Sequence, residues 1–425
     1  MLAWVFIGSF LLFIVLRLPI AFALGASSLI FILGSGFSLL IIPQVMITTF
    51  DSFVLLAIPL FMMAGELMNY GGITDRLFGF ASKLVGHITG GLAHVNVVAN
   101  MIMAGMSGSA VADASGIAVI AIPSMEKEGF DVDFSAAITA AASTIGPIIP
   151  PSVPFVIYAA TSGVSVGALF AGGAVPGVIM GMFLMIAVYF ISVRRHYPRH
   201  PRARLGELGI AFCKAFPALC APIIIIGGIL TGAFTPTEAA GVAVLYAFVL
   251  GVFVYKELTW RRALEVILNV GKNAASVMII ISMASVFAYV LAYVGLAQSV
   301  AHLIMGITTN KYLILLIINI LLLIVGCFME PTSTLLVLIP MLLPAIDAVG
   351  INRVHFGVVA VLNLMIGLLT PPVGVCLYIV SKVARISFER AVVAVWPLIM
   401  VLIAVLILIT YVPILVLWLP SVVLK

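Results

Sequence analysis

The chain has 425 residues, of which 64% are hydrophobic and only 8% are charged, and its mean hydropathy is +1.34. Because a soluble domain carries about 25% charged residues, this composition excludes a soluble protein. The formal net charge of +5 comes from basic residues scattered over many short loops. This distribution is typical of membrane-topology signals and not of a nucleic-acid-binding surface, so we expect the lipid bilayer as a partner and no nucleic acid.

Apolar runs of about 20 residues recur along the whole chain, which is the length that a helix needs to cross the hydrocarbon core of a bilayer. The alternation of apolar and polar residues expected of barrel strands is absent. The first half predicts, in chain order, spans at 2–16, 20–42 and 52–69, a short amphipathic stretch at 74–87, a hairpin-like pair of helices at 92–125, a broken span at 134–160 and a span at 170–193. A basic loop, 194–214, follows.

The second half repeats this order, with an offset of about 221 residues between matching motifs. It predicts spans at 215–233, 238–255 and 272–293, a short stretch at 297–306, a hairpin-like pair at 313–348, a broken span at 355–380 and a span at 391–419. The repeat is clearest where the broken spans are interrupted, since the string GPIIPP that begins at Gly146 is matched by GLLTPP beginning at Gly367. Paired breaks of this kind are typical of secondary transporters.

The repeats should be inverted relative to each other. If each hairpin enters and leaves the membrane on one side, each repeat crosses the membrane an odd number of times, and the second copy is turned over. The sequence therefore predicts an all-α integral membrane protein with two inverted repeats, re-entrant helical hairpins and broken transmembrane helices. The repeats are expected at 1–193 and 215–425, each made of a scaffold (1–70 and 215–293), an arm (74–90 and 295–308), a hairpin with its broken span (92–160 and 312–381) and a last span (170–193 and 391–420).

Basic residues orient this arrangement in the membrane. If the loop 194–214 lies in the cytoplasm, only Lys311, Arg353 and Lys425 of the 20 Lys and Arg residues fall on the opposite side. Cytoplasmic loops of membrane proteins carry an excess of Lys and Arg, and this signal is independent of the hydropathy that defines the spans. Both termini are therefore expected to face away from the cytoplasm.

The interruptions predict cation sites. A broken span loses backbone hydrogen bonds, and inside a bilayer such a break is tolerated only where it lines a cavity or binds an ion. The freed carbonyl groups and nearby hydroxyls are hard oxygen ligands that suit Na⁺ as a coupling ion, with no transition metal and no other cofactor. We predict one Na⁺ site in each half, formed by Ser107, Ser109, Thr144, Gly146 and Ile149 in the first and by Gly326, Thr332, Ser333, Gly367 and Thr370 in the second.

The same interruptions predict an anion site. Helix N-termini at the two hairpin tips, after Ser109 and after Glu330, would direct partial positive charge at an anionic substrate. A carboxylate could be held in this way without a buried Arg. The residues expected to contact an organic-acid substrate are Ser109, Asp113, Pro151, Ser152, Thr334 and Pro371.

The roles of several acidic residues allow two interpretations. Asp113 is either an intramembrane functional acid or the N-cap of the second hairpin helix. Glu330 either caps a helix or has a functional role. Glu238 follows the string Thr235-Pro236-Thr237, which favours a capping box, and Glu66, near the end of a span, favours a position at the membrane interface.

Other function classes lack their signals. The six histidines are dispersed and form no metal-binding helix motif, and no Walker lysine motif is present, so the sequence indicates neither an enzyme nor an ATPase. An ion channel remains an alternative, although neither a selectivity-filter string nor rings of pore charges are visible.

Four strings taken in order resemble the large membrane subunit of tripartite ATP-independent periplasmic (TRAP) transporters. They are AIPLF from Ala57 with Gly65-Glu66, SGSAVAD from Ser107, IIPPS from Ile148 and FTPTEAA from Phe234. The resemblance extends over nearly the whole chain. It implies an elevator-type, sodium-coupled importer of organic acids in a bacterial inner membrane, with sialic acid favoured and C4-dicarboxylates next.

The resemblance also implies two protein partners, a small membrane subunit and a soluble periplasmic substrate-binding protein. Since no small-subunit segment precedes Met1, the small subunit is expected to be a separate chain. A carboxylate transporter that works without a binding protein remains an alternative.

Overall fold

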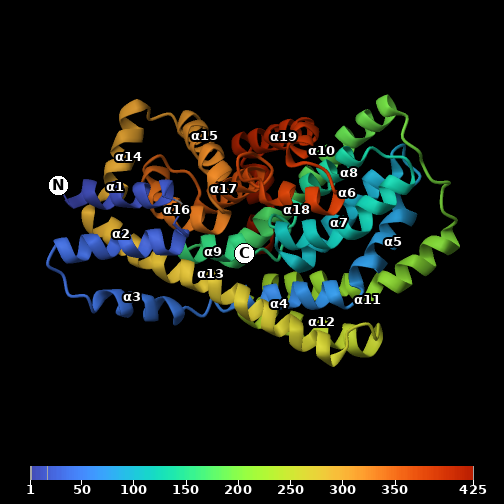
Figure 1. The fold of residues 1–425 in the computed structure, drawn as a ribbon, viewed down its shortest axis with the longest axis horizontal. Helices are drawn as coiled ribbons and strands as arrows, with labels where there is room; N and C mark the ends of the chain where they lie inside the picture. The colour runs from blue at the N-terminus through green and yellow to red at the C-terminus, as the bar shows by residue number, and fades with distance from the viewer. Residues whose placement is uncertain (1, 17, 425) are drawn as a thin grey trace.

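The computed structural model describes residues 2–16 and 18–424, and all the elements in these ranges are helices (Figure 1). The first half contains α1 (Leu2–Val15), α2 (Ile20–Gly34), α3 (Ile41–Phe50), α4 (Ala57–Tyr70), α5 (Ile73–Val85), α6 (Gly91–Ser107), α7 (Ala110–Lys127), α8 (Val132–Ser143), α9 (Val153–Ser162) and α10 (Val166–Arg195). The second half contains α11 (Leu205–Leu230), α12 (Pro236–Val249), the π-helix η1 (Leu250–Val254), α13 (Trp260–Val294), α14 (Leu296–Ile307), α15 (Lys311–Phe328), α16 (Pro331–Ala348), α17 (Arg353–Gly367), α18 (Val375–Ala384), α19 (Phe388–Tyr411) and α20 (Ile414–Val423). Arg17 and Lys425, which contribute to the charge bias, lie outside the described residues.

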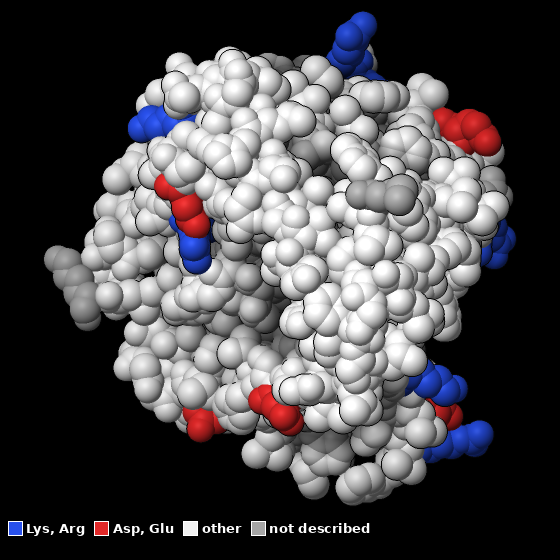
Figure 2. Space-filling model, turned by 90° about the vertical axis from the view of Figure 1, so that its left-hand side faces the viewer, with Lys and Arg blue, Asp and Glu red and all other residues white. Residues whose placement is uncertain are grey.

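The surface is that of a membrane protein. Six of the described helices are long and apolar enough to cross a bilayer. The face shown in Figure 2 is almost entirely uncharged, with Lys, Arg, Asp and Glu at only a few scattered positions. Large apolar side chains such as Trp4, Phe22 and Ile223 are well exposed. Such a surface is stable only against lipid or another apolar partner.

Both predicted hairpins and both predicted breaks are confirmed. In the first half α6 and α7 meet at a short turn, and α8 and α9 are separated by residues 144–152, which we call the first break. In the second half α15 and α16 meet in the same way, and residues 368–374 between α17 and α18 form the second break. We call the turns at 107–110 and 328–331 the first and second tips.

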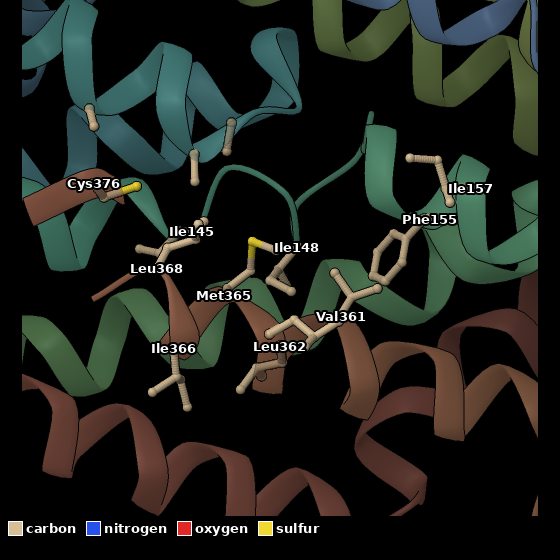
Figure 3. Close-up of a cluster of buried hydrophobic side chains, with 14 of the residues drawn as sticks. Ile145, Ile148, Phe155, Ile157, Val361, Leu362, Met365, Ile366, Leu368 and Cys376 are labelled. Carbon is tan, nitrogen blue, oxygen red and sulfur yellow. The ribbon is translucent and has the colours of Figure 1, made fainter. Parts of the chain in front are cut away.

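The hairpins and broken spans of the two halves pack into one unit. Helix α7 packs against α18 and α9 packs against α16, so each hairpin contacts the broken span of the other half. Figure 3 shows the dry core of this unit, where Ile145 and Ile148 of the first break lie beside Leu362 and Met365 of α17. These side chains are almost completely buried. We call α6 to α9 together with α15 to α18 the site block.

A second group of helices forms a frame beside the site block. Helix α13 lies along α2, α3 and α4, while α12 packs between α4 and α11. We call α1 to α4 with α11 to α13 the scaffold. Two amphipathic helices connect it to the site block, α5 against α6 and α14 against α16 (Figure 1). They correspond to the two predicted arms.

Several predicted boundaries differ from the structure. The expected span 20–42 ends at Gly34, and a separate helix, α3, begins at Ile41. The last expected span is likewise divided, because α19 ends at Tyr411 and α20 begins after Pro413. Part of the basic loop 194–214 is helical, since α11 begins at Leu205. The first of these turns carries the Gly-Ser string from Gly34 to Ser38 and the second carries Pro413, which are local turn signals within otherwise apolar runs.

Candidate functional site

The first tip is held against the first break. Ser109 is the N-cap of α7, and its hydroxyl accepts a hydrogen bond from the amide of Ala112 at 3.4 Å. Gly108 has φ +60°, and a Cβ at this position would lie 2.6 Å from the carbonyl oxygen of Pro151. Only glycine combines this conformation with such a close backbone approach. The tip and the break of the first half are therefore in direct contact.

The second tip has an acidic cap. Glu330 is the N-cap of α16, and its carboxylate accepts hydrogen bonds from the amide of Ser333 at 3.3 Å and from the hydroxyl of Thr332 at 2.7 Å. Thr334 donates to the backbone carbonyl of Glu330 at 3.1 Å. The capping interpretation of Glu330 is therefore confirmed. The capping box of Thr235 and Glu238 is confirmed as well.

The two tips border a common cavity of about 380 Å³. The site block contributes both tips, with parts of α7 and α9, Pro147 from the first break and Leu368 from the second. The opposite wall belongs to the scaffold and consists of Met62, Gly65 and Glu66 of α4 and Val270, Asn273 and Val277 of α13. Among the described residues that line the cavity, the charged ones are Glu66 and Glu330, and there is no Lys, Arg or His.

Four of the predicted first-site residues lie on the first tip and the first break, which are in contact with each other through Gly108 and Pro151. Ser107 and Ser109 line the cavity. Thr144 is buried and its hydroxyl donates to the carbonyl of Ala141 at 2.6 Å, which leaves oxygen lone pairs free for a cation. Gly146 lies behind the tip. Ile149, the fifth residue, lies against Gly177 of α10, on the outer side of the break.

The second predicted Na⁺ site shows the same kind of junction. The backbones of Gly326 and Gly367 are in contact, because a Cβ on Gly367 would lie 2.5 Å from the carbonyl oxygen of Gly326. The hydroxyl of Thr370 donates to the carbonyl of Gly367 at 3.0 Å and accepts from the thiol of Cys327 at 3.2 Å. Thr332 lines the cavity and Ser333 is buried at the tip. Both junctions are therefore rich in backbone and hydroxyl oxygens.

Asp113 lies behind the first tip. It is completely buried on α7, and neither carboxylate oxygen has a hydrogen-bond partner among the described residues. A Cβ on Gly146 would lie 2.3 Å from this carboxylate. The N-cap interpretation of Asp113 is wrong, because Ser109 holds that position. A buried carboxylate without a partner requires a proton or a cation beside it.

The predicted substrate residues divide into two groups. Ser109 lines the cavity, whereas the structure places the other five outside its lining, namely Asp113, Pro151, Ser152, Thr334 and Pro371. Ser152 instead caps α9 and donates to the carbonyl of Pro147 at 2.5 Å. Sequence reasoning missed the scaffold wall: Glu66 was expected at the membrane interface and Asn273 was not singled out. An acidic residue inside a span was the available signal for Glu66.

The contact between Gly326 and Gly367 gives a testable prediction. Replacing Gly367 with Ala should lower the midpoint of thermal unfolding, because the new methyl group meets a backbone oxygen that has no free space to move; overpacking of this kind costs about 1–3 kcal/mol. Gly271→Ala on α13 is the matched control, since a Cβ there meets no atom within 4 Å. Equal melting points for the two variants in detergent would contradict the close crossing.

The comparisons with known proteins agree with this geometry. Residues 7–415 match the family model described as tripartite ATP-independent periplasmic transporter, DctM component. The chain is 45% identical to the sialic acid TRAP transporter large permease protein SiaM of Vibrio cholerae over 95% of each chain, and 39% identical to the 2,3-diketo-L-gulonate TRAP transporter large permease protein YiaN of Escherichia coli over 96% of each. The crystal structure of the Alcanivorax borkumensis YdaH transporter has a similar fold, with a TM-score of 0.63 and 12% identity over 86% of each chain. The chain therefore belongs to the DctM component family of tripartite ATP-independent periplasmic transporters, and it is a multi-pass transport protein of the bacterial inner membrane.

Proposed function

We propose that the chain is the transport subunit of a Na⁺-coupled importer of organic acids that receives its substrate from a periplasmic binding protein. The observation that carries this proposal is the single cavity bordered by both hairpin tips on one side and by the scaffold on the other. An importer of this class places its substrate and ion sites where interrupted helices of two repeats meet. Family membership supports the transport function itself.

Sodium coupling is supported by the chemistry of the two junctions. Each combines backbone carbonyl groups with the hydroxyls of a tip or break, and the second junction brings Gly326, Gly367 and Thr370 into contact. Oxygen ligands of this type suit a hard monovalent cation. Two ions bound behind the tips would also stabilise the ends of the helices that face the cavity.

The substrate class follows from the helix ends and from the relatives. Helix α7 begins at the first tip under an uncharged cap, Ser109, so its N-terminal partial positive charge faces the cavity, whereas the carboxylate of Glu330 offsets the partial positive charge of α16. The end of α7 supplies an attractive field for a carboxylate, although no basic side chain is found among the described residues that line the cavity. We favour sialic acid as the substrate, because the sequence is 45% identical to a permease named for sialic acid. A C4-dicarboxylate is the next candidate.

An elevator movement is supported by the interface between the site block and the scaffold. A Cβ on Gly65 of α4 would lie 3.1 Å from Cα of Ser107, and a Cβ on Gly105 of α6 would lie 2.9 Å from the ring of Pro222 on α11. Contacts through small residues leave a smooth surface along which a rigid block can slide. We propose that the site block moves as one body, with α5 and α14 as its arms.

In our proposal, the structure corresponds to the state of the transport cycle in which the cavity faces the cytoplasm. Glu66 lies in the last turns of α4, and the helix that follows, α5, carries Arg76 and Lys83. The scaffold residues of α13 that line the cavity belong to its first half, which follows the basic pair Arg261-Arg262. With basic residues on the cytoplasmic side, the tips lie toward the cytoplasm.

The proposed partners are a small membrane subunit on a separate chain, a periplasmic binding protein and the bilayer itself.

In a reconstituted system, Na⁺-driven uptake of radiolabelled sialic acid should therefore require this chain, the small subunit and the binding protein together. Omitting the binding protein should reduce uptake to the level of empty liposomes. Full uptake by this chain alone would contradict the proposal.

Sodium coupling predicts the behaviour of two single variants. Ser107→Ala and Thr332→Ala should each raise the Na⁺ concentration for half-maximal uptake about ten- to a hundredfold, because a lost interaction with a charged group costs about 1.5–3 kcal/mol. Ser115→Ala is the control, since Ser115 lines the same cavity but lies outside both junctions. An unchanged Na⁺ activation curve in both variants would remove these residues from the proposed sites.

The elevator movement predicts that the block can be trapped. Val111 of α7 and Val270 of α13 line opposite walls of the cavity. In a background without the native cysteines, Val111→Cys with Val270→Cys, joined by a reducible bifunctional thiol reagent, should stop uptake, and a reductant should restore it. Each single-cysteine variant treated in the same way is the control. Undiminished uptake by fully cross-linked protein would contradict a rigid-body movement.

A further inference from the structure

The two carboxylates in the cavity belong to different bodies and have different surroundings. Glu330 is part of the second tip, and its oxygens are engaged by Thr332 and Ser333. Glu66 is on α4 of the scaffold, half buried, and none of the described residues forms a hydrogen bond or an ion pair with it. The carboxylate of Glu66 is therefore available to whatever occupies the cavity.

A substrate in this cavity cannot avoid Glu66. A cavity of about 380 Å³ is small enough that a ligand filling it lies within roughly 10 Å of Glu66, a distance at which unit charges still interact in a partly desolvated site. No Lys, Arg or His among the described lining residues offsets the charge of Glu66. A carboxylate held at the tips would therefore be repelled from the scaffold wall.

This repulsion depends on the position of the site block. Ser107, Ser109, Thr332 and the carboxylate of Glu330 would travel with the block and act on the ligand in both states. Glu66 would stay with the scaffold and act in only one of them. A group that interacts with a ligand in only one of two states changes the affinity of that state alone, and it shifts the equilibrium between the states by the same factor.

We propose that Glu66 is a release residue, a scaffold carboxylate that faces the substrate only when the site block is at the cytoplasm-facing end and weakens the binding of the organic anion there. This inference rests on the proposed elevator function and specifies how the affinity of its site changes during transport. Glu66 does not alter the accumulation that the Na⁺ gradient can drive. It raises the substrate concentration at which the cytoplasm-facing site fills, and so it prevents the substrate from rebinding after release.

The electrostatic part of the proposal can be tested without a substrate. Val111 is 41% exposed and lines the cavity, so Val111→Cys in a cysteine-free background reports the local potential through its rate of reaction with thiol reagents of different charge. Glu66→Gln should raise the rate with an anionic methanethiosulfonate and lower the rate with a cationic one, changing their ratio about tenfold. A neutral reagent should react at the same rate in both proteins.

Two control variants accompany this measurement. Glu66→Asp keeps the charge and should retain the parent ratio. Glu265→Gln removes an exposed carboxylate of α13 that pairs with Arg261 outside the cavity lining, and it should also leave the ratio unchanged. An unchanged ratio in Glu66→Gln would overturn the proposal.

The state dependence is tested by transport through the complete reconstituted system. With radiolabelled sialic acid, Glu66→Gln should lower the internal concentration for half-maximal efflux about tenfold, while the uptake KM from the binding protein and the Na⁺ activation curve stay as in the parent. A shift of the Na⁺ curve with unchanged efflux would make Glu66 a cation ligand and overturn the proposal. If the parent protein does not transport sialic acid, this result counts against the proposed function. The thiol-reagent ratio then tests the charge effect of Glu66 on the cavity independently of transport.

Discussion

The central constraint on this protein is that backbone polar groups inside a bilayer must find partners within the protein. Two breaks and two tips in the described chain violate regular helical bonding, and each is compensated locally. Ser109 and Glu330 cap the helices that begin at the tips, and Ser152 both caps α9 and bonds the carbonyl of Pro147. At the second junction the carbonyl of Gly367 accepts a hydrogen bond from the hydroxyl of Thr370, so backbone and hydroxyl oxygens lie together there. The same physical requirement therefore creates the fold and the oxygen-rich sites within it.

Close backbone approach makes these junctions possible. In the first half, Gly108 of the tip contacts Pro151 of the break. In the second half, Gly326 of hairpin helix α15 contacts Gly367 at the end of α17, next to the break. A dry core beneath them, including Ile148 and Met365, joins the two halves into one unit. Only small residues separate this unit from the scaffold at Gly65 and Gly105. A block that is firmly packed inside and meets the scaffold closely at these positions suits the rigid-body movement that we propose for it.

The cavity combines contributions from both bodies, and this division gives the scaffold a chemical role. In our proposal the N-terminus of α7 at the first tip attracts an organic anion, while Glu66 on the opposite wall repels it. If the site block moves relative to the scaffold as proposed, these opposing fields give the site an affinity that depends on conformation. A transport cycle benefits from such a difference, because a site that binds equally well in both states releases its substrate slowly on the side of delivery.

The sequence by itself determined the class of the molecule and the placing of its hairpins and breaks, because hydropathy, paired Gly-Pro strings and the distribution of basic residues are properties of the chain alone. It also identified residues such as Ser107, Ser109 and Thr332 that the structure brings to one cavity. It left open whether Asp113 is a functional acid or the cap of α7, it placed the ends of α2 and α19 too late, and it gave an acidic residue inside a span as a signal for Glu66 but no signal for Asn273. That Glu66 and Asn273 form the opposite wall of the cavity was decided by the tertiary structure, since it depends on which helices of the two halves pack together, and side-chain spacing along one helix carries no information about a helix some 200 residues away.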